Sequence, residues 1–389
     1  MDRQRVAGRP FRFFDNREKY LLFVTTCGEK QASAERIGRE CAGLRPRPPA
    51  LRVFDAGMGD ATVLAMVLRD LHYRWPTVPF FVVAKEISRE DVRIGLDKLA
   101  DRFHEHPRMV VIITNLYYTE APWLFPNRSA AQAALNWREV ALEGGTTHEF
   151  DAQIKDQRDF VSDGWRTTAG RKTGNPLYVK PSVLVLYRAD QRFALDSLIP
   201  RRGTRDHAYD LVIVSQPYRA RSPVDIKVRQ VLAPLARALA PGGRMITIQS
   251  TGRDPGMEII RAVWPGETPF QTPRRALIEA LCEHLASDVP DLVCRDRDDA
   301  EFRYRLQLAP DETGETIGTS TLLAAWNAAT YVAQIEDRRL TEAMSRGDYL
   351  EATRKVLARH GGLWFNNECF VITRRREDGG ASAGEENVP

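Results

Sequence analysis

Residues 51–64, LRVFDAGMGDATVL, contain the pattern that decides the fold. The segment begins with apolar residues that favour a β-strand. Gly57 and Gly59 follow, at positions where a chain can turn sharply and a ligand can approach the backbone. Thr62 then begins an apolar helical face, and the first turn of a helix offers free amide groups to a ligand. The segment predicts a strand, a ligand-binding loop and a helix, although an ordinary strand-to-helix turn would have a similar pattern.

The loop sequence separates two classes of nucleotide-like cofactor. A dinucleotide fingerprint that starts at Gly57 requires glycine or alanine where this chain has Thr62. The alternative pattern, acid-x-G-x-G-x-small, runs from Asp55 to Ala61 and resembles motif I of the class I S-adenosylmethionine (SAM) methyltransferases. Ala61 replaces the glycine that this family most often has. An acidic residue beside the loop suits a cofactor that carries a sulfonium cation and no pyrophosphate.

Further segments follow in the order that this family requires. They are PFFVVAKE at 79–86, MVVIITN at 109–115, YDLVIVSQPY at 209–218, and a helix at 224–240 that leads through Pro241-Gly242-Gly243 into a strand at 244–249. The resemblance implies that Glu86 accepts hydrogen bonds from the ribose hydroxyls and that adenine lies near Asn115. It implies SAM as the cofactor, with contacts from Asp55, Gly57, Gly59, Asp60, Glu86, Ile87, Thr114, Asn115 and Ser215.

The continuous apolar strands predict an α/β fold with a sheet covered on both faces. Alternation of strands and helices predicts right-handed crossovers and a doubly wound, mostly parallel sheet, the Rossmann-like methyltransferase fold. A ligand then lies beyond the carboxyl ends of the strands. Two alternating segments, FRYRLQL at 302–308 and ECFVITR at 368–374, predict a C-terminal antiparallel strand pair.

The domain organisation follows from these motifs. Residues 1–45 are expected to form a helical lid, 46–378 the methyltransferase domain, and 379–389 a disordered tail. In the lid, Phe14, Lys19 and Tyr20 either touch the ligand or pack on the sheet edge. A large insertion at about 121–205 contains Trp123, Trp137 and Trp165, and is either a substrate lid or interaction platform, or a peripheral addition.

A second insertion, at about 318–362, is predicted to be helical. A helix follows Thr319-Ser320, and another covers 349–358. Trp326, Asn327 and Trp364 are candidates for contact with substrate, but helical spacing favours core packing.

Residues 215–218, Ser-Gln-Pro-Tyr, are the candidates for catalysis. They resemble the (Asp/Asn/Ser)-Pro-Pro-Tyr loop of amino methyltransferases, in which a side chain and a carbonyl accept hydrogen bonds from the target amino group and the aromatic ring stacks on it. The resemblance implies catalytic roles for Ser215, Gln216 and Tyr218, although Gln216 replaces the first proline and an ordinary turn would look alike. A hydroxyl acceptor would need a base, for which His207, Glu120 and Tyr218 are candidates.

Composition indicates a cytoplasmic enzyme. The chain has 389 residues, 43% of them hydrophobic, and a net charge of only +4. No signal-peptide pattern and no apolar run of membrane-spanning length is present. The five cysteines, Cys27, Cys41, Cys282, Cys294 and Cys369, are expected to be reduced thiols. The histidines and acids do not suggest a metal site.

The sequence therefore predicts a SAM-dependent methyltransferase. The acceptor, whether a small molecule, a protein or a nucleic acid, is undefined, with a lean toward an amino nitrogen. Two alternatives remain open: an NAD(P)-dependent oxidoreductase, and a non-catalytic SAM-binding protein with an interaction or regulatory role. Nothing in the sequence predicts the oligomeric state.

Overall fold

The computed structural model describes residues 17–170, 175–205, 208–296, 298–307 and 317–376. The expectations for Phe14, His207 and the tail at 379–389 lie outside these residues.

The strands of the described chain form one ten-stranded sheet and a separate two-stranded sheet, β5–β6. The large sheet has the order β10-β12-β9-β8-β1-β2-β3-β7-β4, and β11 also pairs with β12. The strands are β1 Leu51–Asp55, β2 Phe80–Lys85, β3 Met109–Thr114, β4 Asn136–Leu142, β5 Thr167–Ala169, β6 Pro176–Tyr178, β7 Ser182–Arg188, β8 Tyr209–Ser215, β9 Leu239–Ser250, β10 Leu292–Arg295, β11 Glu301–Arg305 and β12 Trp364–Arg374.

Helices connect and cover these strands. The α-helices are α1 Arg17–Thr26, α2 Glu29–Cys41, α3 Thr62–Arg74, α4 Arg89–Leu96, α5 Ala100–Glu105, α6 Ser129–Ala133, α7 Thr147–Lys155, α8 Arg158–Gly164, α9 Arg192–Leu195, α10 Val224–Lys227, α11 Ala233–Arg237, α12 Pro255–Val263, α13 Arg274–Leu285, α14 Thr319–Val332, α15 Asp337–Arg346 and α16 Asp348–His360. Short 3₁₀ turns lie at Ala121–Trp123, Ala189–Gln191 and Asp298–Ala300, and a π-helical turn lies at Val228–Leu232.

The centre of the sheet is parallel, as predicted. β1 pairs in parallel with β2 and β8, β2 with β3, and β8 with β9. Asp55, the last residue of β1, is opposite Ala84 on one side and Ile213 on the other, so the carboxyl ends of these strands meet at one edge. The predicted antiparallel closure is also confirmed, because β12 runs antiparallel to both β9 and β11.

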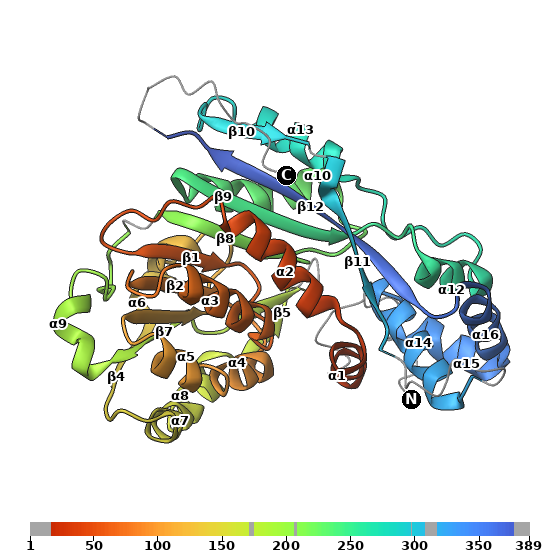
Figure 1. Cartoon of the computed structure of the whole chain (residues 1–389), viewed down its shortest axis with the longest axis horizontal. Coiled ribbons are helices and arrows are strands. Elements are labelled where there is room, and N and C mark those ends of the chain that lie inside the picture. The colour runs from red at the N-terminus through yellow and green to blue at the C-terminus, as the bar shows by residue number, and fades with distance from the viewer. Residues whose placement is uncertain (1–16, 171–174, 206–207, 297, 308–316, 377–389) are drawn as a thin grey trace.

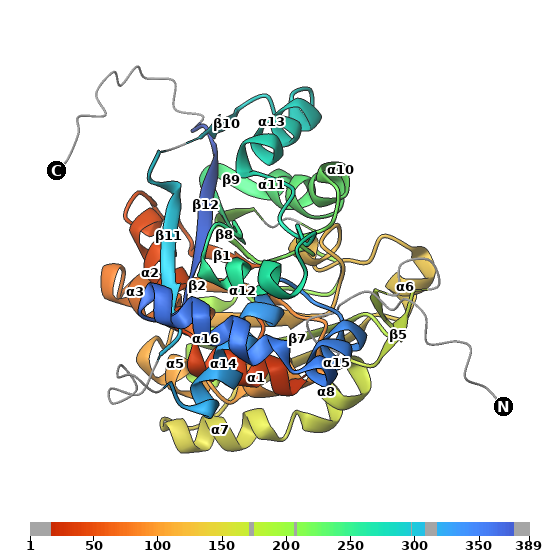
Figure 2. The same cartoon turned by 90° about the vertical axis from the view of Figure 1, so that its right-hand side faces the viewer.

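Helices cover both faces of the sheet (Figures 1 and 2). On one face α2, α3, α5, α7 and α8 pack on the side chains of Val53, Val82 and Val111. On the other face α10, α11 and α13 pack on Phe54 and Val83. This two-sided burial explains why the central strands are continuous apolar runs.

A third apolar cluster lies at the far end of β11 and β12 (Figure 1). It joins α12, α14 and α16 to α1, and contains the side chains of Phe23, Tyr304 and Phe365. The region at 318–362 was expected to contain two helices and has a third, α15, between them. Trp326 stacks on Trp264 with ring centres 5.6 Å apart, in keeping with core packing rather than contact with a ligand.

The insertion at 121–205 extends the sheet. Its strand β7 pairs antiparallel with β3, and β4 pairs in parallel with β7 at the edge. The apolar run of β7 is buried because helices cover both of its faces. The insertion is therefore built into the central sheet, a placement that its sequence did not predict.

Two details of the sheet differ from the expectations. Residues 241–243 lie inside β9, which begins at Leu239, where the pairing with β8 shifts register. A side chain on Gly243 would place its Cβ 2.5 Å from the carbonyl oxygen of Tyr209, so this close approach of two strands requires glycine. The helix expected at 224–240 ends at Arg237, after its π-helical turn.

The prediction that all five cysteines are reduced was wrong for two of them. Cys282 and Cys294 form a disulfide that joins α13 to β10. The chain reverses between this helix and this strand and brings the two Cα atoms to 6.5 Å, a proximity that scattered cysteine positions do not reveal. Cys27, Cys41 and Cys369 are free and buried.

Within the described ranges, no helix combines the length and the apolarity needed to cross a membrane. The same residues contain no group of three or more His, Cys, Asp or Glu side chains placed to hold a metal ion.

Candidate functional site

The glycine loop lies between β1 and α3 at the carboxyl edge of the sheet. Asp55 Oδ1 accepts a hydrogen bond of 3.0 Å from the amide of Gly57. Gly59 has φ +52°, and Ala61, the residue before α3, has φ +61°. Both lie in the left-handed region, which glycine adopts without penalty and which costs an alanine some backbone strain.

Glu86 follows β2 and connects it to this loop. Its Oε2 accepts from the amide of Gly59 at 2.8 Å, and its Oε1 accepts from the amides of Ile87 at 2.7 Å and Ser88 at 2.8 Å. Burial raises the pKa of the Glu86 carboxyl, and the carboxylate of Asp91 raises it further. The structure thus places the acid at the end of β2 directly against the glycine loop.

Both features line a cavity of about 320 Å³, within the size range of small-molecule sites. The cavity lies where the sequence predicted a ligand, at the carboxyl ends of the central strands. Its lining contains five acidic side chains and two lysines: Glu29, Asp55, Asp60, Glu86, Asp91, Lys30 and Lys85. Burial raises the pKa of Asp55 to about 7, although the amide of Gly57 acts in the opposite direction.

A cluster of charges ties the N-terminal helices to the loop. Lys30 of α2 forms an ion pair with Asp60, and its ammonium also donates to Tyr20 Oη at 2.9 Å. Lys98 Nζ lies 3.0 Å from Asp60 Oδ2 and donates a hydrogen bond to the hydroxyl oxygen of Thr62. Burial alone would raise the pKa of Asp60, but the two lysines lower it well below its usual range.

An aromatic wall forms part of the cavity lining. It consists of Phe23 from α1, Tyr304 from β11 and Tyr331 from α14, all of them buried. Phe23 stacks on Tyr331 with ring centres 4.8 Å apart and meets the edge of Tyr304 at 6.2 Å. Further polar groups of the lining come from Gln216, Ser250 and Gln334.

Most of the predicted cofactor residues line this cavity, but two do not. Asp55, Gly57, Gly59, Asp60, Glu86, Ile87 and Ser215 are part of the lining. Thr114 and Asn115 lie outside it and bind the insertion: the Thr114 hydroxyl donates to the carbonyl of Ser182, and Asn115 Nδ2 donates to the carbonyl of Gly164. Both are fully buried, and their hydrogen bonds hold the insertion to the end of β3.

Residues 215–218 do not have the shape that the resemblance implied. Gln216 has φ +47°, whereas proline is restricted to about −65°. A loop with proline at this position therefore has a different backbone conformation. Gln216 Nε2 donates to Ser250 Oγ at 3.0 Å and lines both the principal cavity and a small neighbouring one.

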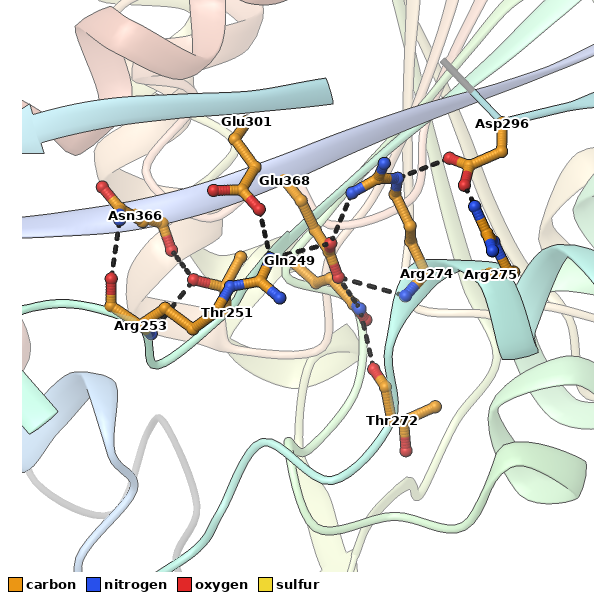
Figure 3. A network of polar contacts seen from close by, with 10 residues as sticks. All are labelled: Gln249, Thr251, Arg253, Thr272, Arg274, Arg275, Asp296, Glu301, Asn366 and Glu368. Carbon is orange, nitrogen blue, oxygen red and sulfur yellow. Dashed lines mark hydrogen bonds and ion pairs between the residues drawn. The ribbon is translucent and has the colours of Figure 1, made fainter. Parts of the chain in front are cut away.

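Tyr218 lines the small neighbouring cavity and is not part of the lining of the principal one. Its hydroxyl donates to Gln249 Oε1 at 2.9 Å. Gln249 Nε2 donates to Glu368 and to the carbonyl of Thr272, at 2.7 and 3.0 Å (Figure 3). The amide oxygen of Gln249 is therefore the atom that faces Tyr218. Burial raises the pKa of the Tyr218 hydroxyl above its usual value.

Two other candidates, Glu120 and Lys19, are not part of the cavity lining. Glu120 accepts from the amides of Tyr117 and Asn127 and from the hydroxyl of Tyr178. Lys19 forms an ion pair with Asp337, the first residue of α15, whereas Tyr20 lines the cavity. No described residue of the insertion at 121–205 lines it.

The insertion contacts the site through a residue outside the lining: Trp165 Nε1 donates a hydrogen bond to the backbone carbonyl of Glu86 at 2.7 Å.

Several lining residues were missed from the sequence: Lys30, Lys85, Tyr118, Tyr304, Tyr331 and Gln334. One of them had a visible signal, since Lys85 is a charged residue inside the apolar run PFFVVAKE. The aromatic wall had none, because its members come from three segments far apart in the chain.

The order of the central strands decides the fold assignment. From the edge of the parallel region it reads β3-β2-β1-β8-β9, and the antiparallel β12 follows. The glycine loop and Glu86 lie after β1 and β2 of this sheet. The chain has the doubly wound, mostly parallel, Rossmann-like sheet that the sequence predicted, closed by an antiparallel strand.

Comparison with known proteins finds only distant structural similarity. No protein-family model and no curated protein matches the sequence. Among solved structures, the [4+2]-cyclase SpnF is 12% identical, with 88% of this chain and 81% of that one covered and a TM-score of 0.35. YjhP from E. coli is 12% identical, with coverages of 88% and 92% and a TM-score of 0.34. A geranyl diphosphate C-methyltransferase from Streptomyces coelicolor is 13% identical, with coverages of 89% and 79% and a TM-score of 0.32. The fold assignment rests on the strand order and not on these likenesses.

Proposed function

We propose that this protein binds SAM in the principal cavity and transfers its methyl group to an acceptor bound beside the aromatic wall. The observation that carries the proposal is the contact between the glycine loop and Glu86, which lines a cavity at the carboxyl edge of a methyltransferase-type sheet. SAM, when bound, supplies a methyl group on a positively charged sulfur.

The residues of the cavity fit this cofactor. A Cβ added to Gly57 would meet only the carbonyl oxygen of Ser215, at 3.9 Å, so the absence of a side chain leaves space for a ligand against the backbone. Glu86 is in position to accept from a ribose hydroxyl, and Ile87 offers apolar surface to adenine. The excess of carboxyl groups suits a cationic ligand, and Lys30 is in position to receive the carboxylate of its amino-acid tail.

The same loop argues against a dinucleotide. A pyrophosphate binds at a helix N-terminus through free amide groups. Here Asp60 Oδ1 already accepts from the amide of Thr62, the first residue of α3, at 3.1 Å. A pyrophosphate would have to displace this carboxylate and would meet Asp55 and Glu86 close by.

The chain's own contribution to methyl transfer is mostly positioning. Because the reaction is a displacement on an activated methyl group, holding the acceptor in line and excluding water supply much of the rate. The aromatic wall and side chains of the N-terminal helices form part of the cavity lining. Two polar side chains at the end of β8, the hydroxyl of Ser215 and the side-chain amide of Gln216, line the cavity and are candidates for orienting an acceptor.

The decisive experiment measures melting temperature with four ligands: SAM, its demethylated product S-adenosylhomocysteine, NAD and NADP. A ligand at ~100 times its dissociation constant stabilises the folded state by about 2.7 kcal/mol, so binding is visible as a raised melting temperature. We expect stabilisation by the first two only. Stabilisation by NADP alone would overturn the proposal. Incubation with labelled SAM and a cell extract, followed by mass spectrometry, then identifies the acceptor.

A further inference from the structure

Lys85 is a largely buried lysine whose ammonium group has few contacts with the rest of the protein. It ends β2, lines the principal cavity and is 8% exposed. Its ammonium lies 4.7 Å from the ring centre of Tyr118, and among the described residues no hydrogen bond or ion pair holds it. A buried ammonium normally has acceptors for its three N–H groups. The ammonium nitrogen is not fully enclosed by the protein and faces the cavity, so its open N–H positions point to an acceptor that a ligand brings there.

The other lysines near the cavity differ from Lys85 in this respect. Lys30 pairs with Asp60, and Lys98 contacts the same carboxylate at 3.0 Å. Burial lowers the pKa of the Lys85 ammonium, and Glu86 offsets this only in part. An anion beside Lys85 would compensate the cost of burying its charge.

Strand geometry places Lys85 on the face of the sheet opposite the glycine loop. Side chains alternate along β2, so Lys85 lies on the same face as Val83, in the cluster against which Tyr118 packs. Ala84, with Met58 and Ala61 of the glycine loop, belongs to the other face. The hydroxyl of Tyr118 donates to the carbonyl of Pro217 at 3.2 Å, which joins this side to the loop after β8.

We propose that Lys85 binds a carboxylate or phosphate group of the methyl acceptor, while the aromatic wall of Phe23, Tyr304 and Tyr331 holds an apolar or aromatic body. The acceptor class is thus a small organic acid with an apolar or aromatic body rather than a neutral compound. This inference rests on the proposed function, because it assigns the loop side of the cavity to the cofactor.

A matched pair of probes tests the proposal without knowledge of the natural acceptor. Benzoate and benzamide share ring and size, but only benzoate carries a charge. Their affinities are measured by NMR for the wild-type protein, with and without saturating S-adenosylhomocysteine. We expect benzoate to bind ~10-fold more tightly, as loss of one charge-assisted contact implies. Lys85→Met and Lys85→Gln should remove this preference, and Lys85→Arg should retain part of it.

The control is Lys355→Met, on the exposed face of α16, which should leave the preference unchanged. Equal affinities of the wild type for the two probes would overturn the proposal. It would also be overturned if Lys85→Met weakened binding of S-adenosylhomocysteine but not of methylthioadenosine, which lacks the amino-acid tail, because the anion would then be the cofactor's carboxylate. Failure of the wild type to bind S-adenosylhomocysteine contradicts the proposed function instead, and the probe preference is still measured without it.

Discussion

The backbone amide of Gly59 donates a 2.8 Å hydrogen bond to Oε2 of Glu86, and so joins the loops that follow two neighbouring strands. The other oxygen of Glu86 accepts from two amides of its own loop. A carboxylate has about four acceptor positions, so the three amides leave one for a ligand. Glu86 thus both shapes the glycine loop and offers a single remaining position to a ribose hydroxyl.

Replacement of Glu86 should therefore weaken cofactor binding. In Glu86→Ala the ligand loses a charge-assisted hydrogen bond and the Gly59 amide loses its partner, and we expect S-adenosylhomocysteine affinity to fall by ~1.5 to 3 kcal/mol. Calorimetry on the folded variant measures this loss. Glu90→Ala, on the exposed surface of α4, is the control. An unchanged affinity in Glu86→Ala would remove this residue from the site.

Asp55 should make folding stability depend on pH. Burial raises its pKa to about 7 in the folded state, against ~3.9 in an unfolded chain. Between these values the folded protein binds more protons than the unfolded one, so this contribution to stability is complete below about pH 4 and is lost as pH rises toward 7. The loss is roughly 1.4 kcal/mol for each unit of pKa difference.

Asp55→Asn keeps an oxygen for the Gly57 amide and removes the charge. We expect the variant to be more stable than the wild type at pH 8, and the difference to shrink at pH 4. Urea denaturation at several pH values measures it. Parallel stability curves for the two proteins would show that Asp55 is not responsible.

Lys30 should anchor the N-terminal helices to the glycine loop. Lys30→Met leaves Asp60 with Lys98 as its remaining cation, and we expect a loss of ~1 to 3 kcal/mol in the free energy of unfolding. Because the pKa of Asp60 is lowered, its contribution is present above about pH 4 and disappears in more acidic solution. Urea denaturation at pH 7 is the measurement. Lys98→Met, at a more exposed site, should cost less, and the reverse order would contradict this account.

Tyr218→Phe should affect stability and not cofactor binding. The variant leaves Gln249 Oε1 without its donor, and we expect a loss of ~1 kcal/mol in unfolding free energy. Affinity for S-adenosylhomocysteine, measured by calorimetry, should stay unchanged because Tyr218 does not line the principal cavity. Tyr73→Phe, on a side chain that is 86% exposed, serves as the control. A large loss of cofactor affinity in Tyr218→Phe would place its hydroxyl in the site after all.

The disulfide has a direct chemical test. Alkylation of the denatured protein without reductant should label Cys27, Cys41 and Cys369, and labelling of all five cysteines should require reductant, as mass spectrometry will detect. Replacement of both Cys282 and Cys294 by serine should lower stability by ~2 to 3 kcal/mol, because the crosslink restricts the unfolded chain. Labelling of all five without reductant would contradict the pairing.

The sequence alone was sufficient for the local features of this protein. Apolar runs bounded by glycine or acidic residues predicted β1, β2, β3 and β8 to within a few residues, because a strand buried on both faces is apolar at every position. The glycine loop and Glu86 were also predicted, since each depends on the residues of one short segment. The order of these segments was enough to predict the parallel sheet.

Only the tertiary structure decided what depends on contact between distant segments. It brought Phe23, Tyr304 and Tyr331 into one wall, paired Cys282 with Cys294, and joined the insertion to the sheet through β7. It also separated Tyr218 from the cavity, through a glutamine fixed by Glu368. These outcomes depend on how the layers pack, and packing is set by the shape and charge of surfaces that no single stretch of sequence contains.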